Sequence, residues 1–225
     1  MSPMRSARNR DTTGAAACGH RGCTDDTRPR WWTVPNGITA LRTVGTVLLC
    51  MVAAGDGGLG WLLAALASYW LGDMADGLVA RVTRTETRTG AVLDILADRL
   101  SVCLIVTLYV VAHPAAALPA GMFLVQFVVL DAYLSLAFLD WPLLSPNYFG
   151  LVDARVFRWN WSPPAKVLNT AAVVLLWLLT QHVVATTALA LLVLAVKVAT
   201  AVRLARRGGA GARAECAVRL AQPAP

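Results

Sequence analysis

Charged residues are scarce in this chain of 225 residues: Asp, Glu, Lys and Arg make up 15% of it, whereas 57% is hydrophobic. Soluble domains usually carry about a quarter charged residues. The deficit excludes a disordered protein, a nucleic-acid-binding scaffold and an ordinary cytosolic globule. A mean hydropathy of +0.58 instead indicates a protein that crosses the membrane several times, because roughly 20 apolar residues make one span and the length has room for about six.

Cysteine is also sparse, and its five positions are too scattered for a disulfide framework. Cys18, His20 and Cys23 are spaced in a way that resembles part of a metal site. A structural zinc site needs four ligands, however, and no fourth ligand lies nearby. We therefore expect no zinc site in this stretch.

The two ends of the chain lack long apolar runs. Residues 1–30 carry six arginines and no apolar segment of the kind that a signal peptide needs. We expect residues 1–30 to form a disordered basic tail that stays on the protein. Residues 206–225 are low in complexity and are predicted to be a flexible C-terminal tail, which leaves 31–205 as the membrane domain.

The apolar runs predict an all-α integral membrane protein with six transmembrane helices, at residues 37–54, 59–81, 90–112, 116–139, 166–184 and 186–204. The first, third and fifth connections carry no Lys or Arg, whereas the second and fourth connections and both ends carry several. The positive-inside rule therefore predicts cytoplasmic N- and C-termini in a multi-pass protein of the cell (plasma or inner) membrane. The long connection at 140–164 is rich in aromatic residues and proline, and we expect it to be structured and interfacial.

Four aspartates gather around the second connection. Asp73 and Asp76 lie three residues apart near the end of the second predicted span, and Asp94 and Asp98 lie four apart near the start of the third. These spacings place each pair on one face of its helix, so two antiparallel neighbours would bring all four carboxylates together. Ionisable groups inside apolar helices are costly and mark functional sites by default.

A divalent cation would hold such carboxylates ionised, and two ions suit phosphoryl transfer. The all-oxygen set predicts Mg²⁺ or Mn²⁺. One alternative is four solvated aspartates at helix ends, paired with Arg81, Arg84 or Arg99. A second is a divalent-cation transporter; transport sites, however, lie near the bilayer midplane, and these aspartates are predicted at the cytoplasmic edge.

The spacing around the aspartates resembles the signature of the CDP-alcohol phosphotransferase family. The pattern D-x2-D-G-x2-A-R-x8-G-x3-D-x3-D matches at every fixed position from Asp73 to Asp98. The resemblance implies an integral membrane enzyme, expected to be a homodimer, that transfers a substituted phosphate from a CDP-linked donor to an alcohol and releases CMP. A catalytically dead scaffold would be expected to have lost an aspartate, and none is lost.

The resemblance also assigns roles to individual residues. It implies that Asp73, Asp76 and Asp94 bind two divalent metals, and that Asp98 joins the metal site and acts as the base toward the acceptor hydroxyl. The residues that it implies for binding the cytidine diphosphate are Asp73, Asp76, Gly77, Ala80, Arg81 and Gly90. Gly77 would also leave room for a bulky group beside the metals, and Arg81 could pair with a phosphate.

The first span resembles one branch of the family more closely. Pro35-Asn36-x2-Thr39-x2-Arg42 is similar to the phosphatidylglycerophosphate synthase branch, which implies CDP-diacylglycerol as donor and glycerol 3-phosphate as acceptor alcohol. Residues 164–170 keep a lysine and a threonine of an element of that branch but lack its glycine and second lysine. Inositol phosphate, phosphatidylglycerol (as in a cardiolipin synthase) and serine therefore stay open as acceptors.

An anionic acceptor alcohol needs cationic ligands, and the basic residues near the predicted site supply candidates: Arg42, Arg155, Arg158 and Lys166. Arg42 lies inside an apolar run, where the alternative is that its side chain reaches out to the interface. For the other three, the alternative is that they only mark the cytoplasmic side of the membrane under the positive-inside rule. Asp131 and Lys197 are further charges within predicted spans, and we expect Asp131 to pair with another helix.

Overall fold

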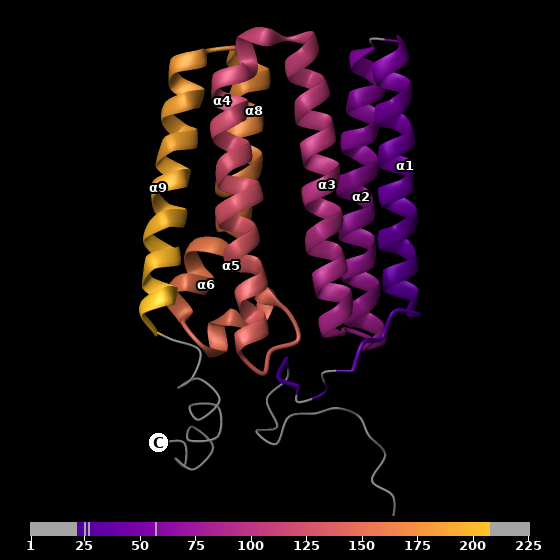
Figure 1. The fold of residues 1–225 in the computed structure, drawn as a ribbon, viewed down its shortest axis with the longest axis vertical. Helices are drawn as coiled ribbons and strands as arrows, with labels where there is room; N and C mark the ends of the chain where they lie inside the picture. The colour runs from indigo at the N-terminus through magenta and orange to yellow at the C-terminus, as the bar shows by residue number, and fades with distance from the viewer. Residues whose placement is uncertain (1–21, 25, 27, 57, 208–225) are drawn as a thin grey trace, which may run out of the picture.

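The computed structural model describes residues 22–24, 26, 28–56 and 58–207, and nearly all of these are helical (Figure 1). Five helices are long and apolar enough to cross a membrane: Val34–Asp56, Arg88–Ala112, Pro114–Asp140, Pro163–Thr180 and Val183–Arg206. The prediction of an all-α integral membrane protein is therefore confirmed.

The first half of the bundle is three long helices packed side by side: α1 (Val34–Asp56), α2 (Leu59–Thr83) and α3 (Arg88–Ala112). A tight turn joins α2 to α3. Arg84 ends α2 in the left-handed conformation at φ 56° and donates its backbone N–H to Ala80 O. Thr87 begins α3 by accepting a hydrogen bond at 2.9 Å from Gly90 N, a helix cap that stabilises the first turn.

α2 is 25 residues long, as is α3, but it is not one of the five helices that meet the length and apolarity requirement. It lies along α1 and α3 over the height of the bundle (Figure 1). Its second half carries Asp73, Asp76 and Arg81, and these charges lower its hydropathy. A sixth span and the cytoplasmic location of both ends stay predictions.

The second half of the bundle begins with the span Pro114–Asp140, which is built from consecutive short segments: η1 (Pro114–Ala116), α4 (Ala117–Leu124), η2 (Val125–Asp131), α5 (Ala132–Leu136) and η3 (Ala137–Asp140). The span Pro163–Thr180 likewise joins α7 (Pro163–Lys166), η5 (Val167–Ala171) and α8 (Ala172–Thr180), and α9 (Val183–Arg207) follows. η2 and η5 are π-helical. Such wide turns are rare and often occur at functional sites.

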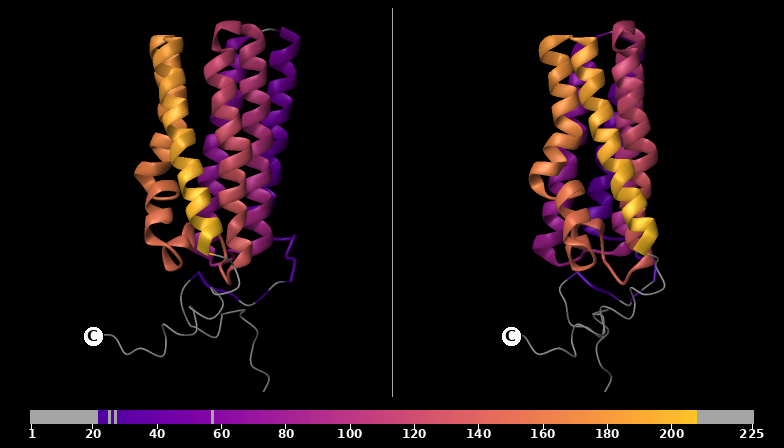
Figure 2. Two further views of the ribbon diagram at one scale, coloured as in Figure 1. Left: turned by 60° about the vertical axis from the view of Figure 1, so that its left-hand side comes forward. Right: turned by 90° about the vertical axis from the view of Figure 1, so that its left-hand side faces the viewer.

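The long connection is folded, as predicted, into η4 (Pro146–Leu151) and α6 (Ala154–Asn160). Phe149 is fully buried between Trp141 and Trp161, with ring centroids 5.3 and 4.7 Å away. Asp153 caps α6 by accepting hydrogen bonds from the backbone of Arg155 and Val156. The connection lies at the end of the bundle where α1 begins and α9 ends (Figure 2).

Residues 22–24 pack against this connection. Thr24 N donates to Pro142 O at 2.9 Å, and Leu144 N donates to Gly22 O at 2.8 Å. Gly22 has φ +94° and lies so close to the Tyr148 ring that any side chain would collide with it. Cys23 is buried there, whereas Cys18 and His20 lie outside the described residues.

A largely buried ion network links three helices across the bundle. Asp131, at the end of η2, accepts hydrogen bonds from Arg99 of α3 at 2.5 Å and from Lys197 of α9. The Lys197 side chain is 1% exposed, and the Arg99 guanidinium lies 4.0 Å from the centroid of the Phe127 ring. Asp131 therefore pairs with two other helices, in agreement with the prediction that it pairs with another helix.

This network predicts a large effect for Asp131→Asn. The variant leaves the buried Lys197 and the partly buried Arg99 without their shared carboxylate, and breaking one partner of a buried pair costs about 3–5 kcal/mol. We expect a lower midpoint of thermal unfolding in detergent, and Asp131→Leu combined with Lys197→Met should recover part of the loss. Asp56→Asn, at the exposed end of α1, is the control. An Asp131→Asn midpoint equal to that of the control would contradict this role.

Candidate active site

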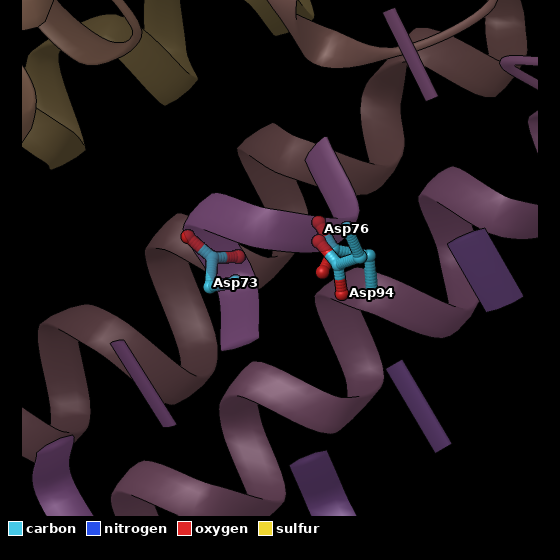
Figure 3. Close-up of side chains that lie close together, drawn as sticks. All are labelled: Asp73, Asp76 and Asp94. Atoms are coloured by element: carbon cyan, nitrogen blue, oxygen red, sulfur yellow. The ribbon is translucent and has the colours of Figure 1, made fainter. Parts of the chain in front are cut away.

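The end of α2 and the start of α3 bring the predicted aspartates together. Carboxylate oxygens of Asp73, Asp76 and Asp94 all lie within 4.8 Å of one another. In Figure 3 the side chains of Asp76 and Asp94 overlap in the view, and Asp73 lies to one side of them, about one turn earlier on α2. Three carboxylates at this separation form an all-oxygen set that could hold a hard divalent ion such as Mg²⁺ or Mn²⁺.

Arg42 of α1 contacts all four aspartates. Its Nε donates to Asp76 Oδ2 at 3.0 Å, and its Nη2 donates to Asp94 Oδ1 at 2.5 Å and to Asp98 Oδ1 at 3.0 Å. The same Nη2 lies 3.7 Å from Asp73 Oδ1. The Arg42 side chain is 2% exposed, so it does not reach out to the surface. The structure thus places this predicted acceptor ligand among the carboxylates.

The surroundings of Arg42 explain why it fits there. Gly72 of α2 lies so close that a Cβ at this position would collide with the Arg42 side chain. The Tyr69 ring lies 5.6 Å from the guanidinium carbon and makes a cation–π contact. Thr39 donates to Asp76 Oδ2 at 2.7 Å. Sequence reasoning missed Gly72 and Tyr69, and their spacing of three residues on α2 was the signal that they share a face.

The aspartates line a cleft of about 530 Å³ that lies between the two halves of the bundle. Its first wall comes from α1, α2 and α3 and includes the residues that we predicted to bind the nucleotide: Asp73, Asp76, Gly77, Ala80, Arg81 and Gly90. Its second wall comes from residues 145–171. Asp98, Arg99, Asp131 and Lys197 also line the cleft, so the buried ion network borders the site.

The two predicted glycines make room for neighbouring side chains. A Cβ on Gly90 would lie 2.7 Å from Asn36 Oδ1, and Asn36 is held by hydrogen bonds from its Nδ2 to Arg30 O and Trp31 O. A Cβ on Gly77 would lie 3.2 Å from Arg81 Nη1. Gly77 therefore lets the Arg81 guanidinium lie back against α2 at the edge of the cleft.

The remaining predicted ligands of the acceptor alcohol separate into two groups. Lys166 lines the cleft, and its Nζ donates to Asn147 Oδ1 at 3.0 Å. Arg155 and Arg158 are exposed on α6 and are not among the residues that line the cleft. A role for these two arginines in acceptor binding stays a prediction.

A second, apolar crevice of about 120 Å³ adjoins the cleft. Leu62, Leu66, Phe123 and Trp177 are among the residues that line it. Tyr69, Trp70 and Thr170 line both the crevice and the cleft. The polar site and the apolar crevice are therefore separated only by side chains that line both of them. No part of the sequence pattern predicted this crevice.

Comparison with known proteins identifies the family. A family model described as CDP-alcohol phosphatidyltransferase matches residues 32–203. Neither the curated proteins nor the solved structures include one that matches. The match covers most of the chain and contains the aspartate cluster, the cleft and the crevice. The chain belongs to the CDP-alcohol phosphatidyltransferase family, whose members transfer a phosphatidyl group from a CDP-linked alcohol to an acceptor.

Proposed function

We propose that this protein transfers the phosphatidyl group of CDP-diacylglycerol to a hydroxyl of glycerol 3-phosphate and releases CMP in phospholipid synthesis. The convergence of four carboxylates in a cleft that adjoins an apolar crevice carries this proposal. A nucleotide with a lipid tail needs a polar and an apolar compartment side by side. A water-soluble CDP-alcohol would leave the crevice without a role.

The donor would bind along the first wall. The nucleotide diphosphate would lie by Gly77, Ala80, Arg81 and Gly90, where Arg81 supplies a cation and the glycines leave space. The acyl chains would leave the cleft past Tyr69, Trp70 and Thr170 into the crevice. Burial of methylene groups among these apolar side chains favours binding in proportion to the area removed from water.

The metal site would be formed by Asp73, Asp76 and Asp94, with Asp98 beside them. Divalent ions bound here, proposed as two Mg²⁺ or Mn²⁺, would neutralise the pyrophosphate charge and polarise the reacting phosphorus. Without metal, Arg42 would supply the positive charge at this place, because its guanidinium contacts all four carboxylates. Asp98 would hold the acceptor hydroxyl and take its proton.

In the proposed reaction the acceptor oxygen bonds to the phosphorus distal to cytidine. The bond between that phosphorus and the bridging oxygen breaks, and CMP leaves with the electron pair. The proton of the attacking hydroxyl passes to an Asp98 carboxylate oxygen, so charge and atoms balance. Lys166, Arg155 and Arg158 are the proposed cationic ligands of the acceptor alcohol, of which Lys166 lies in the cleft.

We further propose the setting of the enzyme in the cell membrane. With α2 as the sixth span, both ends and the basic connections would lie in the cytoplasm, and the cleft would open to the cytoplasmic leaflet. Arg84, between α2 and α3, and Arg155 and Arg158, between η3 and α7, support this orientation. The family resemblance supports a homodimer.

The first prediction from this function concerns turnover. Purified protein with CDP-diacylglycerol and Mg²⁺ or Mn²⁺ should release CMP with glycerol 3-phosphate, and not with inositol 1-phosphate, inositol, serine or phosphatidylglycerol. Asp98→Asn should reduce kcat by about 10²-fold or more, the size of a lost general base, and still insert into membranes. Release with a different compound would change the acceptor alcohol only. Full activity of Asp98→Asn would exclude its role as base.

The second prediction concerns Arg42. Its guanidinium occupies the carboxylate oxygens that a metal ion needs, so Arg42→Gln should raise the affinity for Mn²⁺ about tenfold or more, measured by calorimetry. The same variant should unfold at a lower temperature without metal, because the carboxylates lose their counter-ion. Arg84→Gln removes a charge from the exposed end of α2 and should change neither quantity. Weaker Mn²⁺ binding by Arg42→Gln would show that Arg42 supports the metal site rather than competes for it.

The third prediction concerns the crevice. Ala120 lines it, and Ala120→Phe should fill part of the space. We expect a higher KM for CDP-diacylglycerol with long acyl chains and little change for a donor with six-carbon chains. Leu118→Phe, at an exposed position two residues away, controls for added bulk. An equal effect of Ala120→Phe on both donors would mean that the acyl chains lie elsewhere.

A further inference from the structure

The second wall of the cleft is polar and nearly uncharged. The hydrophilic side chains that it contributes are hydroxyl or amide groups and a single lysine: Ser145, Asn147, Asn160, Lys166, Asn169 and Thr170. No carboxylate from residues 145–171, all of which the structure describes, lines the cleft. This composition differs from the first wall, where the aspartates lie, and it is the composition expected for recognition of hydroxyl groups.

Asn160 leaves a buried oxygen without a hydrogen bond. Asn160 is 3% exposed and is the last residue of α6. Its Nδ2 donates to Val156 O at 2.9 Å, which fixes the orientation of the amide. Its Oδ1 has no partner within the described part of the chain. A buried oxygen that accepts no hydrogen bond is destabilising. The O–H group of a ligand could donate the missing hydrogen bond.

Ser145 supplies a second oxygen of the same kind. It is 8% exposed, lies directly before η4, and lines the same cleft as Asn160. Its Oγ likewise finds no partner among the residues with described positions. Two residues with unpaired oxygens, one near each end of the folded connection, therefore line the same cleft. Stacking of Phe149 on Trp161 supports the connection between them.

Lys166 completes this wall with a cation. Its Nζ is bonded to the neutral amide of Asn147 rather than to a carboxylate, so its charge is not neutralised by that contact. Asn169, in the π-helical η5, donates to Trp159 O at 2.9 Å and ties the start of this span to α6. This hydrogen bond holds the segment that carries Lys166 against the connection that carries Ser145 and Asn160.

We propose that Ser145, Asn160 and Lys166 select an acceptor alcohol with an anionic group and at least two hydroxyl groups. One hydroxyl attacks the phosphorus, and the second, which is not consumed, donates a hydrogen bond to Asn160 Oδ1 with Ser145 Oγ beside it. Lys166 binds the anionic group. This inference rests on the proposed function and adds which groups of glycerol 3-phosphate the second wall recognises, namely the phosphate and the hydroxyl that does not react. It excludes serine, which has a single hydroxyl.

The test compares glycerol 3-phosphate with 3-hydroxypropyl phosphate, which lacks only the second hydroxyl. With full-length protein and saturating CDP-diacylglycerol, we expect the ratio of the two kcat/KM values to be about 10 to 100, because the analogue leaves buried oxygens unpaired. Asn160→Leu should bring the ratio close to 1 while the KM for CDP-diacylglycerol stays the same. If Asn160 had a merely structural role, the variant would lower kcat/KM for both acceptors equally and leave their ratio unchanged.

Ser145→Ala is a milder variant that keeps the test decisive if Asn160→Leu does not fold, and it should lower the ratio several-fold. Ser162→Ala removes a hydroxyl from the same connection, where Ser162 Oγ donates to Arg158 O away from the cleft, and should keep the wild-type ratio. Equal use of both acceptors by the wild type, a ratio unchanged in Ser145→Ala, or release of CMP with serine would overturn the inference. If no acceptor alcohol releases CMP, the proposed function itself fails.

Discussion

The ion cluster of Arg42 with Asp73, Asp76, Asp94 and Asp98 is the constraint on which the site depends. Four carboxylates in an apolar bundle repel one another strongly because the surroundings screen their charges poorly. The guanidinium of Arg42 contacts each of them and joins α1 to both helices of the hairpin. Gly72 allows this arrangement, because any side chain at that position would displace Arg42. A single small residue on α2 thus controls how closely α1 approaches the face that carries the aspartates.

A second ion cluster balances the first across the cleft. Asp131 joins Arg99 of α3 to Lys197 of α9, so the half of the bundle that carries the aspartates is linked to the half that carries the other wall. Asp98 and Arg99 are adjacent on α3, and one contacts the first cluster while the other contacts the second. Movement of either half of the bundle would therefore shift Arg99, which is the neighbour of the proposed base Asp98.

The predictable part of this site is the part that depends on local spacing. Asp73, Asp76, Asp94 and Asp98 lie three and four residues apart on two helices joined by a tight turn, so helical periodicity alone brings them together. The position of Arg42 depends instead on the rotation of α1 about its axis, which no local pattern specifies. The π-helical turns of η2 and η5 were not predicted for the same reason, because the packing of neighbouring helices decides where a wide turn is tolerated. Of the six predicted spans, the second, at residues 59–81, fails the apolarity requirement, because the aspartates of the site are part of α2.

The two walls of the cleft also explain why the sequence predicts the family more readily than it predicts the acceptor alcohol. The first wall carries the residues proposed to bind the groups that the proposed chemistry always needs, a diphosphate and divalent ions. These residues lie within one hairpin at fixed spacing. The second wall is assembled from residues as distant as Ser145 and Asn169, and a folded connection positions them rather than a helical repeat. Its hydrogen bonds can change with the acceptor alcohol without disturbing the aspartates. We therefore expect the choice of acceptor alcohol in such a fold to depend on tertiary packing. Unpaired buried oxygens such as Asn160 Oδ1 indicate which residues of the packed structure take part in that choice.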